Sequence, residues 1–96
     1  MDIKVKSHRL EVVEEGDSSG DVNIYKHYMT VVLAKGETDI MIARNEQTGE
    51  LSYYYVESDG SEEEAQEDEL YEVAEWMEEM VGPLDDPDGW DGLPLV

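Results

Sequence analysis

The chain contains no cysteine, and this absence removes several kinds of chemistry at once. Disulfide bonds, thiolate metal sites and cysteine nucleophiles are all excluded, and nothing in the sequence indicates an oxidising compartment. Long hydrophobic runs are also missing, because no stretch approaches the roughly 18 apolar residues of a membrane-spanning helix. The N-terminus alternates charged and apolar residues and so lacks the apolar core of a signal peptide. We therefore expect a cytoplasmic protein that does not associate with membranes.

Basic residues are scarce and unevenly placed. The chain has 6 Lys and Arg against 26 Asp and Glu, which gives a formal net charge of −20. All six basic residues lie within residues 1–44, where eight acidic residues leave a net charge of −2. Residues 45–96 hold eighteen acidic residues and no Lys or Arg, so they carry the remaining −18. Charge of this sign repels DNA, RNA and anionic lipid, and the expected partner is a basic protein surface.

Length and composition set the size of the fold. With 96 residues, 40% of them hydrophobic, the chain can build one modest core, so we expect a single domain over residues 1–96 and exclude a multi-domain enzyme. The predicted fold class is α+β, in which one helix packs on an antiparallel sheet. Residues 1–57 are expected to form a four-stranded meander, residues 61–81 an amphipathic acidic helix, and residues 82–96 an acidic irregular extension rich in Pro and Gly.

Four runs rich in Val, Ile, Thr and Tyr predict the strands. They are residues 2–14, 22–34, 38–43 and 51–57. We expect the first two to pair as a hairpin, and the change in apolar parity between Val5 and Leu10 predicts a bulge near Ser7 and His8. The third run is almost continuously apolar, so both of its faces should be covered.

The predicted helix rests on a capping-box pattern and on its apolar spacing. Ser61 is followed three residues later by Glu64, and Gly82-Pro83 marks an end. At about 100° per residue, six apolar side chains fall on one stripe. They are Leu70, Val73, Ala74, Met77, Met80 and Val81. The opposite arc is carboxylate, and Tyr71 and Trp76 lie at its borders.

The acidic residues of this segment approach the charge density of a nucleic acid. The ten acidic residues from Glu62 to Glu79 would occupy about 27 Å of helix, or about one charge per 2.7 Å. Duplex DNA carries about one charge per 1.7 Å of axis. Such a row can compete with DNA for a basic groove, and further aspartates in the extension could lengthen it. The candidate partner-binding residues are Glu64, Glu67, Asp68, Glu72, Glu75, Glu79, Asp85, Asp86, Asp88 and Asp91.

The chain resembles DNA-mimic proteins in its small size, its acidity, its lack of cysteine and the carboxylate rows of its 57–91 region. Many of these are encoded by phages or mobile elements, and they include anti-CRISPR and anti-restriction inhibitors that evade host defence. The resemblance implies a non-catalytic inhibitor that acts on a nucleic-acid-processing enzyme through a protein–protein interaction. Alternatives are an immunity or antitoxin protein against a nuclease toxin, or an acidic haloadapted accessory domain without a basic partner. The least specific alternative is an acidic face that only maintains solubility.

No catalytic, cofactor-binding or metal-binding residue is assigned from the sequence. His8 and His27 are the only histidines, and without cysteine they could supply at most two metal ligands, so we interpret both as structural. The aspartate run after Leu84 fails the EF-hand register, because the position that requires glycine is Asp91. Phosphate-binding loops and nucleophile motifs are also missing, so we expect no enzymatic activity. The chain is expected to be a monomer or a homodimer.

Overall fold

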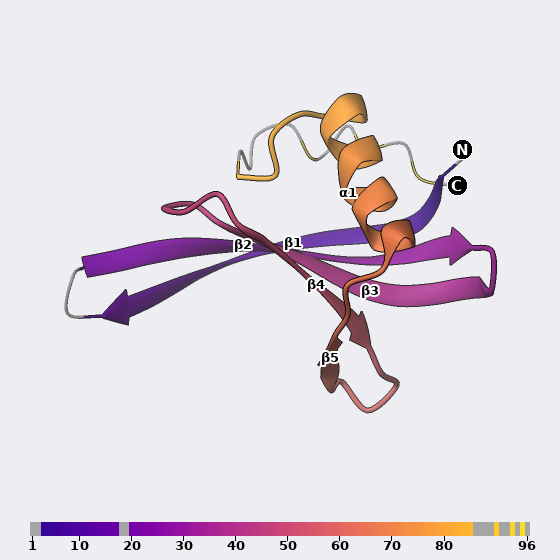
Figure 1. Ribbon diagram of the computed structural model, residues 1–96, viewed down its shortest axis with the longest axis horizontal. Coiled ribbons are helices and arrows are strands. Elements are labelled where there is room, and N and C mark those ends of the chain that lie inside the picture. Colours follow the sequence, from indigo (N-terminus) through magenta and orange to yellow (C-terminus); the bar gives the residue numbers. More distant parts are fainter. Residues whose placement is uncertain (1–2, 18–19, 86–89, 91–92, 94, 96) are drawn as a thin grey trace.

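The computed structural model describes residues 3–17, 20–85, 90, 93 and 95. Its elements are β1 (Lys4–Asp17), β2 (Gly20–Leu33), β3 (Gly36–Asn45), β4 (Leu51–Val56), β5 (Glu62–Glu64) and α1 (Asp68–Met80). The strands form an antiparallel sheet in the order β1-β2-β3-β4-β5, and α1 crosses one face of it (Figure 1). The α+β class and the meander are therefore confirmed, but the sheet has five strands and not four.

The long β1–β2 hairpin confirms the first expected pairing. It runs from the pair Lys4 and Val32 to the pair Asp17 and Gly20, with a register shift between Val5 and Ser7. This irregularity is the predicted bulge. Because of it, Val5 and Leu10 both pair with residues of β2 that are buried, although their separation in the sequence is odd.

Strand β3 is the central strand, and its apolar run is covered on both faces as expected. Residues 40–43 are at most 8% exposed. Ile40 and Ile42 belong to the core cluster together with the inner face of α1. Met41 points to the other face, where its direct cross-strand neighbours are Tyr28 on β2 and Tyr54 on β4. On this second face, tyrosine side chains therefore flank Met41, whereas α1 packs on the face of Ile40 and Ile42.

The prediction that a helix begins at Ser61 is wrong, because the chain reverses there into a strand. Gly60 has φ 87°, and its N–H donates to the Glu57 carbonyl at 2.9 Å. The Ser61 N–H donates to Asp59 Oδ1 at 2.9 Å. These bonds close a tight turn that pairs β5 with β4, placing Glu62 opposite Val56. Turn chemistry at Asp59 and Gly60 thus overrides the capping-box pattern.

Helix α1 is consequently shorter than the predicted 61–81. It begins after Glu67, whose side chain makes no capping hydrogen bond, and its C-cap is Val81, whose N–H bonds the Met77 carbonyl at 3.0 Å. Its buried residues are Leu70, Val73, Ala74 and Met77. Met80 was also predicted to be buried, but it is 52% exposed because it lies in the final turn, at the edge of the apolar stripe.

Part of the predicted C-terminal extension packs onto the core. Leu84 is fully buried, Trp90 is 5% exposed and Leu93 is 6% exposed, whereas Leu95 is 52% exposed. The indole N–H of Trp90 donates to the Pro83 carbonyl at 3.2 Å. The extension therefore contributes apolar side chains to the same core as the sheet and α1.

Across the described residues, the structure contains no helix that is long and apolar enough to span a membrane.

Candidate protein-binding surface

The outward side of α1 carries a line of carboxylates. Asp68, Glu72, Glu75 and Glu79 are all exposed, and their spacing places them on one arc opposite the buried residues. We call these four residues the acidic ridge. The six acidic residues from Asp68 to Glu79 occupy about 17 Å of helix, or about one charge per 3 Å. The predicted charge density is thus retained within the helix, while the continuous row is shorter than expected because residues 62–64 form β5.

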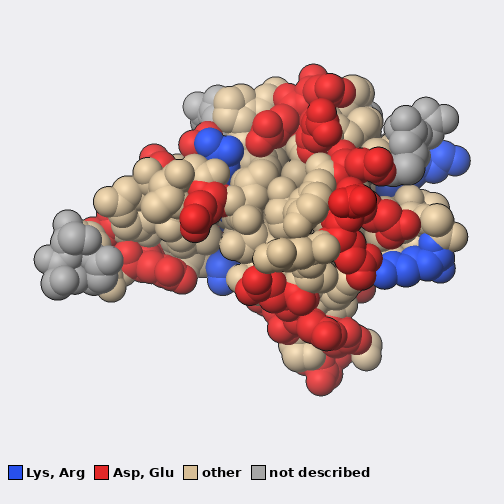
Figure 2. All heavy atoms as spheres, viewed as in Figure 1, with Lys and Arg blue, Asp and Glu red and all other residues tan. Residues whose placement is uncertain are grey.

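The acidic surface continues beyond the helix. Figure 2 shows Asp and Glu side chains gathered over α1 and over the β4–β5 hairpin beneath it. The exposed acidic residues of this hairpin are Glu57, Asp59, Glu62, Glu63 and Glu64. Basic side chains lie toward the margins of the same face (Figure 2). The acid on this side of the molecule therefore forms an extended surface that includes the ridge.

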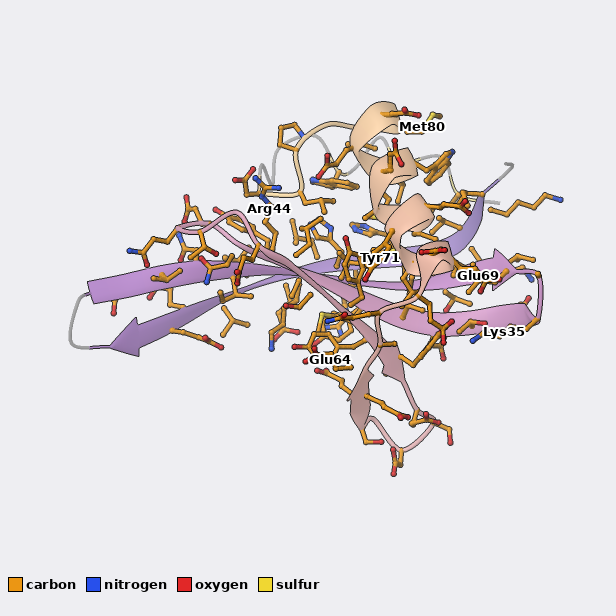
Figure 3. All side chains as sticks on the ribbon, viewed as in Figure 1. Lys35, Arg44, Glu64, Glu69, Tyr71 and Met80 are labelled. Carbon is orange, nitrogen blue, oxygen red and sulfur yellow. The ribbon has the colours of Figure 1, made fainter. Side chains whose placement is uncertain are left out.

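Arg44 neutralises part of the surface near the C-terminal end of α1 (Figure 3). Its Nη1 lies 3.8 Å from Glu78 Oε1, and its Nε lies 3.4 Å from Asp85 Oδ2. The buried Nε has no aligned hydrogen-bond acceptor, so this contact with Asp85 is an ion pair without a good hydrogen bond. Arg44 thus attracts the two carboxylates at the side of α1 and leaves the ridge unpaired.

Lys35 has a comparable position near the N-terminal end of α1, where Figure 3 labels it beside Glu69. The Lys35 Nζ lies 4.0 Å from the ring centroid of Tyr55, and the Tyr55 hydroxyl donates to the carboxylate of Glu67. Burial, followed by this hydrogen bond to Glu67, raises the pKa of the Tyr55 phenol. Glu67 is thereby fixed against the sheet at the start of the ridge.

An aromatic side chain adjoins the ridge. Glu72, Glu75 and Glu79 line a shallow groove of about 230 Å³ together with Ile3 and Trp76. Trp76 lies at the border of the apolar stripe, where it is half-buried and packs against the core. Large aromatic residues are enriched among the side chains that carry most binding energy at protein interfaces. The ridge therefore combines a row of charge with an apolar contact.

The other border of α1 contacts the fourth strand. Tyr71 packs edge-on against Tyr53 with ring centroids 4.8 Å apart. The same two tyrosines and Glu64 line a groove of about 390 Å³, so Glu64 lies on β5 and outside the ridge. Burial raises the pKa of the Tyr53 phenol. Tyr53 and Tyr55 both contact the core cluster, whereas Tyr54 contributes to the opposite face, because side chains alternate along a strand.

The structure brings together four of the ten predicted binding residues in the ridge, namely Asp68, Glu72, Glu75 and Glu79. Three others lie in three different environments. Glu67 adjoins the ridge, Glu64 lies on the β4–β5 hairpin, and Asp85 is paired with Arg44. The remaining three, Asp86, Asp88 and Asp91, lie outside the described residues.

The two histidines form a buried cluster that the sequence did not reveal. His27 is fully buried, and its Nε2–H donates to the Leu84 carbonyl at 2.8 Å. Its Nδ1 must then accept the 3.0 Å bond from His8 Nε2, which assigns the tautomer of both rings. Burial lowers the pKa of His27 to about 4 and also lowers the pKa of His8. Both rings are therefore neutral near pH 7.

Trp90 completes this cluster and joins it to the C-terminal segment. Its ring stacks on His8 with centroids 5.3 Å apart, and its centroid lies 4.5 Å from that of His27. No third ligand accompanies the two histidines, since the described part of the chain holds no group of three or more His, Cys, Asp or Glu able to bind a metal. The geometry of the cluster therefore serves to hold the segment after α1 against the sheet.

Comparison of the chain with protein-family models, with curated proteins and with solved structures finds no match.

Proposed function

We propose that the protein is a non-catalytic inhibitor of a nuclease or of a CRISPR or restriction effector. It binds the basic nucleic-acid-binding surface of that enzyme, and its carboxylates occupy positions that DNA phosphates would take. The observation that carries this proposal is the acidic ridge. Asp68, Glu72, Glu75 and Glu79 are exposed and in line on one helix, and no ion pair involves them within the described residues.

The packing of α1 supports such a role because it fixes the ridge in space. Leu70, Val73 and Met77 are fully buried beneath it, so the helix cannot rotate without opening the core. A surface that is already ordered loses less conformational entropy on binding than a flexible tail of the same charge. The charges at i and i+4 repel one another by a few tenths of a kcal/mol per pair, and a basic partner would relieve this repulsion.

The contacts around the ridge support a protein partner in particular. Complementary charge fixes the sign of the partner and accelerates association, but this attraction weakens as salt is added. Trp76 and Ile3 in the adjoining groove offer an apolar contact that salt does not screen. Binding to a shaped basic surface should consequently persist at salt concentrations that remove adventitious basic proteins.

The same surface would also suit an immunity or antitoxin protein that occupies the active site of a nuclease toxin. The two functions share the same electrostatic requirements, so only the identity of the inhibited enzyme distinguishes them. A haloadapted accessory domain without a partner would behave differently. Its stability would increase with salt, and its ridge would be replaceable without loss of any interaction.

The test is inhibition of DNA cleavage by a panel of purified restriction enzymes, CRISPR effectors and nuclease toxins. Three proteins are compared: the wild type, the ridge variant E72K/E75K/E79K, and the matched control D21K/E46K/E50K. Both variants change the net charge of −20 by +6, to −14, and the three control positions are exposed and lie outside α1. We expect the wild type and the control to inhibit at least one enzyme, and the ridge variant to inhibit none.

Inhibition by the ridge variant that equals inhibition by the wild type would show that the ridge is not the binding site. If no enzyme is inhibited and NaCl raises the free energy of unfolding equally for all three proteins, salt adaptation replaces the proposal. Circular dichroism of each variant establishes that the domain remains folded.

A further inference from the structure

Strand β1 lies at one end of the sheet, and its outer edge pairs with no other strand among the described residues. Such an edge presents unpaired N–H and C=O groups that a further strand can bind. Many proteins protect long edges with bulges or with short strands. Here the only register shift lies between Val5 and Ser7, so the stretch Ser7–Asp17 continues without interruption.

The charges along β1 are arranged in two halves. The first half carries Lys4, Lys6 and Arg9, and the second half carries Glu11, Glu14 and Glu15. When two copies of such a strand pair antiparallel, the basic half of each lies against the acidic half of the other. The strand is therefore complementary to itself, although the molecule as a whole has a net charge of −20.

We propose that two copies of the protein associate through β1 in antiparallel orientation, about a two-fold axis that passes Leu10. The two five-stranded sheets then become one sheet of ten strands. In this register Leu10 faces the second copy's Leu10, Arg9 faces Glu11, and His8 faces Val12.

Neighbouring registers fit less well. Moving the axis by one residue toward either end of the strand places Arg9 opposite Arg9 or Glu11 opposite Glu11, and like charges directly opposite are destabilising. Moving it to Val12 places Leu10 opposite Glu14. The register centred on Leu10 avoids both faults and pairs Ser7–Val13 with itself, on the regular side of the bulge.

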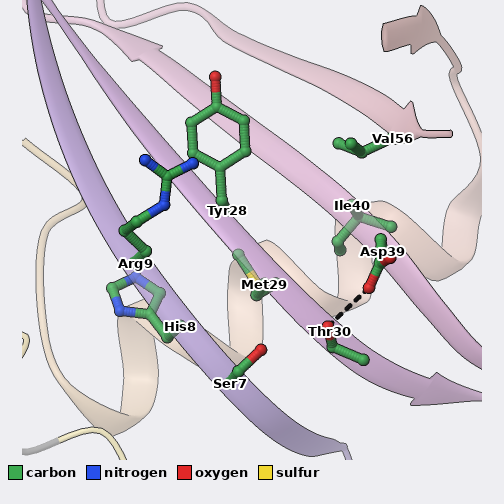
Figure 4. Close-up of a pocket in the computed structure, with 9 residues that line it drawn as sticks. All are labelled: Ser7, His8, Arg9, Tyr28, Met29, Thr30, Asp39, Ile40 and Val56. Atoms are coloured by element: carbon green, nitrogen blue, oxygen red, sulfur yellow. Dashed lines mark hydrogen bonds between the residues drawn. The ribbon is translucent and has the colours of Figure 1, made fainter. Parts of the chain in front are cut away.

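Oppositely charged side chains already lie together at this edge. Arg9 Nη1 lies 3.2 Å from Glu11 Oε2 of the same strand, and the guanidinium lies 4.5 Å from the Tyr28 ring centroid. Figure 4 shows Arg9 beside Tyr28 at the pocket on this part of the sheet. Two copies would bring two such pairs together, so that positive and negative groups alternate across the axis.

Apolar side chains favour the same contact. Val12 is 45% exposed, and Leu10 is only partly buried against the core. The tip of the β1–β2 hairpin also has little lateral support. Residues 20–22 pair with β1 alone, the Asn23 carbonyl accepts one hydrogen bond from the Glu46 N–H at 3.1 Å, and the hairpin projects from the body of the molecule (Figure 1). A two-stranded ribbon is marginally stable by itself, and a second β1 adds a third strand beside it.

A two-fold axis perpendicular to the sheet places both α1 helices on the same face of the dimer. The two acidic ridges would then face in a common direction. The dimer does not depend on the proposed function, because it rests on residues of β1 and not on those of the ridge.

The first experiment measures molecular mass by sedimentation equilibrium over a range of protein concentrations. The ionic strength is physiological, so that the Debye length is about 8 Å. We expect a species of twice the 10.9 kDa chain mass. Each of R9E and E11R should raise the dissociation constant of the dimer by about tenfold or more, and R9E/E11R should restore it. The control K35E has the same charge change as R9E at the β2–β3 turn, and it should leave dimerisation unchanged.

The second experiment uses the absence of native cysteine and does not require a charge variant to fold. L10C places the two introduced thiols opposite one another, so mild oxidation should link two chains rapidly. T48C, in the exposed loop after β3, provides the matched control and should link much more slowly. The proposal is overturned by a monomer at every concentration, by a dimer that is insensitive to R9E and E11R, or by L10C linking no faster than T48C.

Discussion

The inner and outer faces of α1 differ in burial and in charge. Leu70, Val73 and Met77 on the inner face have no exposed surface, whereas Glu72 and Glu79 on the outer face are exposed to solvent. The inner residues hold the helix on the sheet, and the outer residues form the ridge that we propose as a binding surface. Substitutions on the inner face should change the free energy of unfolding, and substitutions on the outer face should change binding.

The largest effect on stability is expected from the inner face. Leu70→Ala removes a fully buried side chain and leaves a cavity beneath α1, so it should lower the free energy of unfolding by about 2–5 kcal/mol. Met80→Ala, at a position that is 52% exposed, should lower it by less than about 0.5 kcal/mol. Urea unfolding measures both values. Similar losses for the two variants would contradict the contrast between the faces.

The buried histidine cluster should make stability depend on pH. The pKa of His27 falls from 6.5 to about 4 on folding, so the unfolded chain gains a proton in this interval while native His27 remains neutral. The free energy of unfolding should therefore decrease between pH 6.5 and pH 4, by up to about 3 kcal/mol from His27. His8, whose pKa is also lowered by burial, adds to the same trend.

The contribution of His27 can be separated from protonation of the many carboxylates by comparing the wild type with His27→Gln. Both proteins carry the same acidic residues, and only the wild type carries a histidine at this position. The difference between their free energies of unfolding should shrink as pH falls from 6.5 to 4. A difference that stays constant over this interval would show that native His27 gains a proton over the same pH range as the unfolded chain.

A smaller effect is expected at the border between the two faces of α1. Tyr71 is 39% exposed, but its ring packs edge-on against Tyr53. Tyr71→Ala should cost about 1 kcal/mol, which combines the aromatic pair with the loss of partial burial. Thermal unfolding can measure this loss, and Tyr71→Phe, which keeps the ring, should retain most of the stability.

The smallest effect, and one of opposite sign, is expected on the outer face. Neutralising the ridge in E72Q/E75Q/E79Q removes like-charge pairs at i+3 and i+4, which should raise the free energy of unfolding by less than about 1 kcal/mol in total. The gain should decrease at high salt, because screening already weakens the repulsion in the wild type. Destabilisation by this triple substitution would mean that the ridge carboxylates support the fold.

The sequence alone predicted the structure correctly where the local residue pattern and the tertiary environment favour the same structure. Alternating apolar residues predicted the β1–β2 hairpin, and the parity change at Val5 predicted its bulge. The capping-box pattern of Ser61 and Glu64 led to a wrong prediction, because such a pattern requires only four residues. The adjacent Asp59-Gly60 turn commits the chain to a hairpin instead. That Asp-Gly pair was the available signal for β5, but a run of three glutamates is untypical of a strand.

Helical periodicity predicted only the part of the candidate site that lies on α1. Spacing alone placed Glu72, Glu75 and Glu79 on the outward arc of α1. It could not place Asp85 against Arg44, because that contact joins β3 to the segment after the helix. The histidine cluster was hidden for the same reason, since it depends on strand register and on Trp90 packing from the far end of the chain.

The central claim is that the acidic ridge is a specific site for a basic nucleic-acid-binding surface. The most direct test immobilises the wild type, E72K/E75K/E79K and D21K/E46K/E50K, and measures which lysate proteins each retains with and without added duplex DNA. We expect that one nucleic-acid enzyme is retained by the wild type and the control, is lost from the ridge variant, and is displaced by DNA. Retention of the same basic proteins by all three would contradict it.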